Sequence, residues 1–154
     1  MVLGRALDEK APSYLLQSLG WSYHAPYAGH NGIQLAVGQV FTKGEDFLFP
    51  YYRDMLTVLS AGMSVEELIL NGISKATDPG SGGRHMSNHF AKPEWHIENV
   101  SSATGTHDLH AAGVRVPWCI MDIRGWRSLR MESLLLRKDM FTRRLTGPVG
   151  KVFL

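Results

Sequence analysis

The sequence predicts an α/β fold in which helices dominate and the strands are short. Apolar residues recur at helical spacing over residues 31–41. A capping box over residues 64–67 marks the start of another helix, and the apolar run 47–49 suits a buried strand. The 154 residues have the length of one domain, and 44% of them are apolar, so the chain can bury a hydrophobic core.

The N-terminal part is predicted to hold two helices that an irregular connection separates. Pro12 stands at a first-turn position of a short helix over residues 12–17. Residues 20–32 are rich in Gly, Tyr, Trp and His, which is typical of irregular structure. A helix over residues 31–41 follows, with Asn31 as a candidate cap.

The middle of the chain is predicted to alternate turns and helices. Residues 42–46 form a turn before the apolar run, which Pro50 ends. A helix over residues 52–61 is terminated by Gly62, and the helix after the capping box continues to about residue 73.

The next part of the chain is predicted to hold a glycine-rich loop, followed by a strand and a helix. Four Gly and Pro residues in the range 78–84 exclude regular structure there. A short strand is predicted over residues 97–102, and another helix begins over residues 109–113.

The charge is distributed unevenly along the chain. Residues 1–113 carry 7 Lys or Arg and 11 Asp or Glu, a net charge of −4, whereas residues 114–154 carry 9 and 3, a net charge of +6. The basic tail indicates either a surface for nucleic acid or anionic membrane, or a stretch that is not the protein's proper sequence. No run of about eighteen apolar residues predicts a membrane span, the start lacks secretion signals, and the single Cys119 fits a reducing compartment.

Three short segments could carry chemistry. Arg53 at the start of a predicted helix would present a planar donor fork beside backbone N–H groups, which suits a phosphate or diphosphate. The alternative is a surface arginine paired with Asp54 or Glu45.

The second segment contains His85 and His89, four residues apart, which would share one face if they lay on a helix. No third ligand stands at a diagnostic spacing, so a zinc site is disfavoured. A substrate-facing imidazole is the better functional interpretation. The alternative is a pair of loop histidines bonded to backbone carbonyls.

The third segment, residues 101–106, is rich in small and hydroxyl side chains, which let a backbone approach a ligand closely. It lacks the G-x-S-x-G pattern of a serine nucleophile. The alternative is a strand-to-helix turn capped by Ser or Thr.

The order of these segments is more specific than any one of them. Residues 28–38, 49–54, 83–90 and 100–106 together resemble the alpha-type half of the thiamine-diphosphate-dependent 2-oxo acid dehydrogenase decarboxylating component, of the branched-chain 2-oxoisovalerate type. The resemblance covers roughly residues 10–114, and pyruvate dehydrogenase relatives are more distant. It implies part of a thiamine diphosphate-binding domain, with a helix-rich N-terminal part and short parallel strands.

The resemblance also implies roles for individual residues. His89 is expected near the substrate, as the catalytic residue. The expected cofactor-binding residues are Tyr52, Arg53, Ser102 and Thr104. A structural potassium ion is expected near Ser101, Ala103, Thr106 and His107.

The implied reaction is oxidative decarboxylation of a branched-chain 2-oxo acid on the cofactor, followed by acyl transfer to lipoyl groups. The implied partners are a beta-type subunit or fused beta half and a lipoyl-bearing acyltransferase, in an alpha2beta2-like oligomer. The enzyme is expected in the cytoplasm, with no membrane and no nucleic acid as partner.

The family also requires a Gly-Asp-Gly motif and a later asparagine to bind magnesium, and Asp122 and Asp139 lie in no such motif. A reading frame offset by one base after Val114 could encode amino-acid sequences that resemble the family. These sequences would restore the aspartate, the glycine after it and the asparagine. We therefore expect residues 1–114 to be the N-terminal part of the dehydrogenase domain, and residues 115–154 to be a frameshifted or divergent basic tail. A genuine C-terminal extension with a basic surface is the alternative.

The chain is thus predicted to be a truncated enzyme, inactive alone. Two other functions stay open at this point: a non-catalytic interaction or regulatory fragment, and a basic nucleic-acid-binding module that uses the tail.

Overall fold

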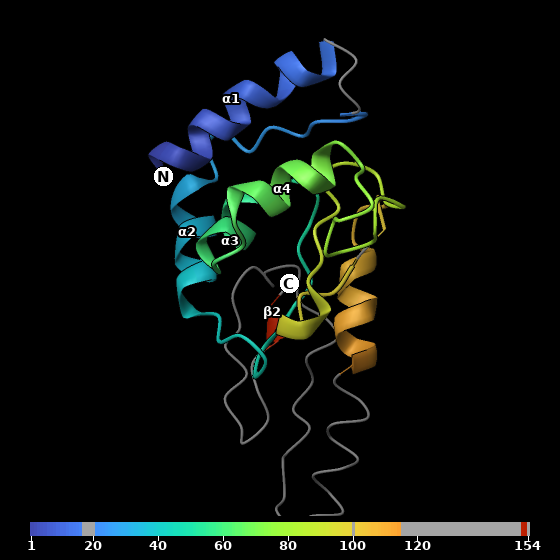
Figure 1. The fold of residues 1–154 in the computed structure, drawn as a ribbon. Helices are drawn as coiled ribbons and strands as arrows, with labels where there is room; N and C mark the ends of the chain where they lie inside the picture. The colour runs from blue at the N-terminus through green and yellow to red at the C-terminus, as the bar shows by residue number, and fades with distance from the viewer. Residues whose placement is uncertain (17–20, 100, 115–151, 154) are drawn as a thin grey trace, which may run out of the picture.

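A computed structural model of the chain describes residues 1–16, 21–99, 101–114 and 152–153. Most of the regular structure is helical, and residues 106–114 form a further helix. The elements in chain order are α1 (Val2–Leu16), α2 (Asn31–Val40), β1 (Phe47–Leu48), α3 (Met55–Ser60), α4 (Val65–Gly72), the 3₁₀ turn η1 (Pro93–Trp95) and β2 (Val152–Phe153). Figure 1 shows α1 lying over α3 and α4, with α2 beside α3.

The helix-rich character is confirmed, but the described residues contain little β-structure. β1 pairs with β2 in parallel, with Phe47 opposite Val152 and Leu48 opposite Phe153. Leu48 also forms an isolated parallel bridge with Ile97. The expected parallel strands are therefore represented by two-residue strands and single bridges.

The hydrophobic core lies between α1, α2, α3 and α4, and β1 contributes to it. Its buried side chains include Leu7, Tyr27, Phe41, Leu48, Met55, Leu56, Val58, Met63, Leu68, Phe90 and Ile97. The segment 21–30 runs back between α1 and α4 (Figure 1), where Trp21 stacks on Tyr14 at a centroid distance of 5.9 Å. A side chain at Gly72 of α4 would collide with the same indole, so the segment is held from both sides.

The prediction of a short helix starting at Pro12 is wrong. α1 begins at Val2 and includes Pro12 in its interior. Leu7 and Ala11, one turn apart, are 7% and 0% exposed. Their burial stabilises a helix that continues through the proline, although the proline removes one backbone hydrogen bond.

The helix predicted over residues 52–61 begins later, at Met55. Tyr52 and Arg53 lie in a turn, because the Asp54 carboxylate accepts the Tyr51 amide at 2.9 Å and the Asp54 amide donates to the Tyr51 carbonyl at 2.9 Å. A side chain that bonds to the preceding backbone in this way favours a turn over a helix.

Two capping predictions have opposite outcomes. The capping box is confirmed: the Glu67 amide donates to Ser64 Oγ at 3.1 Å, and the Ser64 amide donates to Glu67 Oε2 at 2.8 Å. Asn31 does not cap α2, since it is the first helical residue, and the cap position belongs to His30 without a side-chain bond. Gly62 follows the last turn of α3 with a φ of +107°, as a terminating glycine should.

The loop predicted at residues 78–84 is confirmed, whereas the strand predicted over residues 97–102 is not. Among the described residues of that stretch, only Ile97 pairs, through bridges to Leu48 and Lys92. The next helix begins at residue 106, three residues before its predicted start. No helix in the described part of the chain is long and apolar enough to cross a membrane. Most of the predicted tail, residues 115–151 and 154, lies outside the described residues.

Candidate active site

A cavity of about 290 Å³ marks the candidate site. It is lined by Tyr23, Tyr52, Met86 and Ser102, which come from four irregular segments between the helices. The lining combines two phenol rings and a thioether with the hydroxyl of Ser102, so the cavity is suited to a flat, partly apolar ligand with a few polar groups.

The turn of residues 51–54 brings Tyr52 to this cavity. The Tyr52 ring meets Tyr23 edge to face at a centroid distance of 5.9 Å. It lies nearly parallel to the His89 ring at 6.4 Å. The turn also joins two phenol groups, because the Tyr51 hydroxyl bonds to the Tyr52 hydroxyl. The Tyr52 and Tyr23 rings therefore line the cavity, and the His89 ring lies beside Tyr52.

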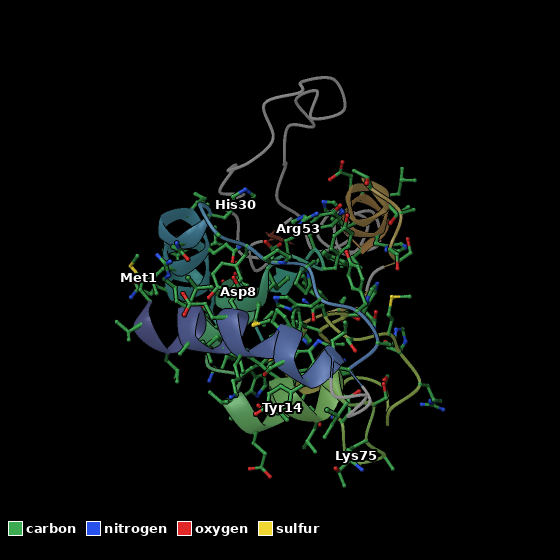
Figure 2. The ribbon with its side chains drawn as sticks, turned by 90° about the horizontal axis from the view of Figure 1, so that it is seen from above. Met1, Asp8, Tyr14, His30, Arg53 and Lys75 are labelled. Atoms are coloured by element: carbon green, nitrogen blue, oxygen red, sulfur yellow. The ribbon has the colours of Figure 1, made fainter. Side chains whose placement is uncertain are left out.

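Arg53 lies at the edge of this aromatic group. Its guanidinium carbon is 5.5 Å from the Tyr52 ring centroid, and Nη1 donates to the Pro26 carbonyl at 3.1 Å. In the view from above, Arg53 lies between α2 and the helix of residues 106–114 (Figure 2). Among the described residues it forms no ion pair with an acidic side chain. A guanidinium carries five N–H donors, so most of its capacity remains for an anionic ligand.

Asp54 closes the turn and is largely buried. Burial raises the pKa of its carboxyl, while the bond from the Tyr51 amide and the charges of His107 and His30 act in the opposite direction. The carboxyl is therefore costly to keep charged, and its hydrogen bonds within the turn compensate for part of this cost.

His89 is buried and held at both ring nitrogens. Its Nδ1 lies 3.1 Å from the Ser87 carbonyl, and its Nε2 lies 2.7 Å from Ser102 Oγ. A carbonyl can only accept a hydrogen bond, so Nδ1 carries the proton, and in the neutral ring Nε2 accepts from the Ser102 hydroxyl. The reactive nitrogen of this histidine is thus directed to a residue that lines the cavity.

His85 does not join His89. The segment 84–90 is irregular and not helical, and His85 is exposed while His89 is 4% exposed. Within the described residues, no cluster of three or more His, Cys, Asp and Glu side chains could hold a metal ion.

The turn of residues 101–106 is closed by its own oxygen atoms. Ser101 Oγ lies 2.7 Å from Thr106 Oγ1, which donates to the Ala103 carbonyl at 2.9 Å. Thr104 Oγ1 lies 3.4 Å from the Tyr51 hydroxyl, which links this turn to the turn of residues 51–54. Gly105 has a φ of +84°, a conformation that its lack of a side chain permits.

An oxygen-only donor set has the chemistry of a site for a hard cation such as potassium. The His107 ring, however, faces elsewhere: it lies 5.6 Å from the Tyr51 ring, and its Nε2 is 3.6 Å from an Asp108 carboxylate oxygen. Two hydroxyls and one carbonyl of the expected set therefore come together, and the imidazole of His107 does not join them.

Sequence reasoning missed several residues of the site. Tyr23 and Met86 form cavity walls, and the Pro26 carbonyl accepts from Arg53. Asn88 has a φ of +66° and donates to the Tyr52 carbonyl at 3.3 Å. The aromatic richness of residues 20–32 was the one sequence signal that could have identified Tyr23.

Comparison with known proteins shows the family to which this chain belongs. The family described as Dehydrogenase E1 component matches residues 1–118, and the chain belongs to this family. It is an oxidoreductase family that depends on thiamine diphosphate, so the resemblance found in the sequence is confirmed.

One similar protein is the 2-oxoisovalerate dehydrogenase subunit alpha of Bacillus subtilis (strain 168), which is 36% identical over 118 residues. The match covers 74% of this chain and 34% of that relative. The chain therefore spans about a third of the length of the curated relative that it matches.

Proposed function

We propose that the described residues supply one wall of the thiamine diphosphate site in a branched-chain 2-oxo acid dehydrogenase. The observation that carries this proposal is that Tyr52 and Ser102 line one cavity, while His89 bonds to Ser102 and the Arg53 guanidinium lies 5.5 Å from the Tyr52 ring. These side chains come from three segments that are far apart in the sequence.

The chemistry of these residues fits the cofactor. A guanidinium binds phosphate oxygens through parallel N–H donors, which is the role we assign to Arg53 on the diphosphate. The Tyr52 and Tyr23 rings would contact the flat heterocycles, and the hydroxyls of Ser102 and Thr104 would bond to their nitrogen atoms. The cavity volume, about 290 Å³, is close to the lower limit for small-molecule sites. When bound, the cofactor supplies the electron sink for loss of carbon dioxide.

We assign His89 the role of the proton-transferring or hydrogen-bonding group beside the substrate. The Ser87 carbonyl orients the ring, and Ser102 occupies Nε2 at 2.7 Å until a ligand replaces that bond. An imidazole so oriented can accept or donate a proton at Nε2.

We also propose the metal and partner assignments that the family suggests. Ser101, Ala103 and Thr106 would hold a structural potassium ion, with His107 nearby, while the magnesium motif would have to come from beyond residue 114. A beta-type subunit or fused beta half and a lipoyl-bearing acyltransferase would complete an alpha2beta2-like enzyme in the cytoplasm. The division into residues 1–114 and a frameshifted or divergent tail also stays a proposal, which the coding DNA would test.

Calorimetric titration of the full 154-residue chain with thiamine diphosphate and magnesium tests the proposal. We expect binding, and we expect Arg53→Ala to weaken it about tenfold to a hundredfold, the typical loss of a charge-assisted hydrogen bond. Arg5→Ala is the matched control, because the Arg5 side chain is 61% exposed on α1 and, within the part of the chain that the structure describes, forms an ion pair with Glu9 alone. Absence of binding to the unaltered chain, or equal binding by Arg53→Ala, would contradict the proposal.

We further propose that this chain alone does not decarboxylate 2-oxo acids, since the glutamate that activates the cofactor is expected in the beta half. Turnover of 2-oxoisovalerate by the purified chain, without a partner, would refute that statement.

A further inference from the structure

Gln34 is a polar side chain of α2 that is buried, at 3% exposed, and it reaches the turn of residues 51–54. Its Nε2 donates to the Arg53 carbonyl at 2.9 Å and lies 3.3 Å from Asp54 Oδ1. Its Oε1 accepts the Leu56 amide at 3.2 Å. Both ends of one buried amide are therefore bonded to the segment that carries Arg53.

The Leu56 bond replaces a missing helix cap. The first N–H groups of a helix have no partner within the helix, and a side chain at the cap position normally accepts from one of them. Asp54 holds the cap position of α3, but its side chain makes no cap bond because it accepts the Tyr51 amide instead. Gln34, from another helix, satisfies the Leu56 amide in its place.

Each carbonyl of residues 51–53 accepts a hydrogen bond from a different residue. The Tyr51 carbonyl accepts from the Asp54 amide at 2.9 Å, and the Tyr52 carbonyl accepts from Asn88 Nδ2 at 3.3 Å. The Arg53 carbonyl accepts from Gln34, which is the bond that ties the turn to α2. Loss of Gln34 would release the peptide unit next to the guanidinium that we assign to the diphosphate.

Gln34 does not line the cavity of the candidate site. It lines a separate cavity of about 40 Å³, together with Asp54, Thr57 and residues of α2. An effect of Gln34 on cofactor binding would therefore pass through the turn and not through a direct contact.

We propose that Gln34 is a positioning residue of the cofactor site, which holds the 51–54 turn so that Arg53 faces the ligand. The inference rests on the proposed function. It predicts a loss of cofactor affinity that depends on the presence of Arg53.

The test uses Gln34→Met, which keeps the length of the side chain but removes its donor and acceptor. Gln39→Met is the matched control, since Gln39 is exposed on the same helix. Titration with thiamine diphosphate and magnesium should show at least a tenfold loss of affinity for Gln34→Met and no change for Gln39→Met. Equal affinity of Gln34→Met and the unaltered chain would overturn the inference and leave the proposed function standing. No binding by the unaltered chain would overturn both.

A double-mutant cycle separates positioning from a general loss of structure. In the Arg53→Ala background, Gln34→Met should weaken binding less than threefold, because the group that it positions is absent. Full additivity of the two effects would overturn the inference.

Gln34→Asn serves where Gln34→Met fails to fold. It puts no charge and no larger group into the buried position beside Asp54, but its amide is one methylene shorter and does not reach the Arg53 carbonyl. We expect it to fold and to bind the cofactor at least tenfold more weakly than the unaltered chain. Unchanged affinity of a folded Gln34→Asn variant would equally overturn the inference.

Discussion

Gly38 sets how closely α2 approaches α3, and replacing it by alanine tests the packing that brings Gln34 to the site turn. A Cβ at Gly38 would collide with the Thr57 carbonyl oxygen and would lie 2.5 Å from the Ser60 Cβ. Gly38 is one helical turn from Gln34, so the same close approach determines whether the Gln34 amide reaches the Arg53 carbonyl.

The expected cost follows from two opposing effects. Overpacking of a close contact typically costs about 1–3 kcal/mol, and here a backbone oxygen takes part, which cannot move away as a flexible side chain would. Alanine gains up to about 1 kcal/mol over glycine inside a helix. We therefore expect Gly38→Ala to lower the free energy of unfolding by about 1–2 kcal/mol, which corresponds to a fall in Tm of about 2–8 °C.

Gly32→Ala is the matched control in the same helix. Among the described residues, no atom outside the helix backbone around Gly32 lies within 4 Å of the Cβ position at Gly32. Only the helix preference therefore remains, and we expect no loss or a gain of up to about 1 kcal/mol. Urea denaturation followed by circular dichroism measures both variants. If Gly38→Ala is as stable as Gly32→Ala, the close α2–α3 contact does not exist in solution and the reasoning fails.

The remaining predictions concern the pH dependence of stability. Burial favours a higher pKa for Glu67, but hydrogen bonds from Lys92 and Ser64 and the Lys92 charge lower it overall below 4.5. The contribution of the Glu67 carboxylate to the free energy of unfolding is therefore present above pH 4.5 and is lost as the pH falls through the lowered pKa. We expect Glu67→Gln to reduce the loss of stability at acid pH, measured by urea denaturation as a function of pH. Identical losses at acid pH in both proteins would contradict this. Burial and the Asp8 carboxylate raise the pKa of Tyr27 to about 12. The contribution of Tyr27 to the free energy of unfolding is complete below pH 10 and is lost between pH 10 and about 12. In urea titrations, Tyr27→Phe should therefore lose less stability than the unaltered chain over this pH range. An equal loss of stability in both proteins would refute the prediction.

Features that depend on neighbours in the sequence were predictable. The Ser64 capping box, the Gly62 termination and the loop 78–84 form as expected, because their hydrogen bonds and backbone conformations involve residues three or four positions apart. The order of the motif segments also identified the family, to which residues 1–118 belong.

Helix limits were less predictable where burial outweighs local preference. α1 extends through Pro12 because Leu7 and Ala11 are buried, and the weakly amphipathic sequence around them gave no periodic signal. α3 starts at Met55 because the Asp54 carboxylate turns back to the Tyr51 amide, an interaction that competes with a helical start.

The sequence alone determined the family and nominated Tyr52, Arg53, His89 and Ser102 as members of one site. Only the tertiary structure decided how they meet: Ser102 bonds to His89, Tyr23 packs against Tyr52, and Arg53 reaches Pro26. These contacts join segments that are distant along the chain, so they depend on how α2 packs against α3 and how residues 21–30 return between α1 and α4. Local patterns contain no information on such distances, and for that reason the role of Gln34 became visible only once the helices were in place.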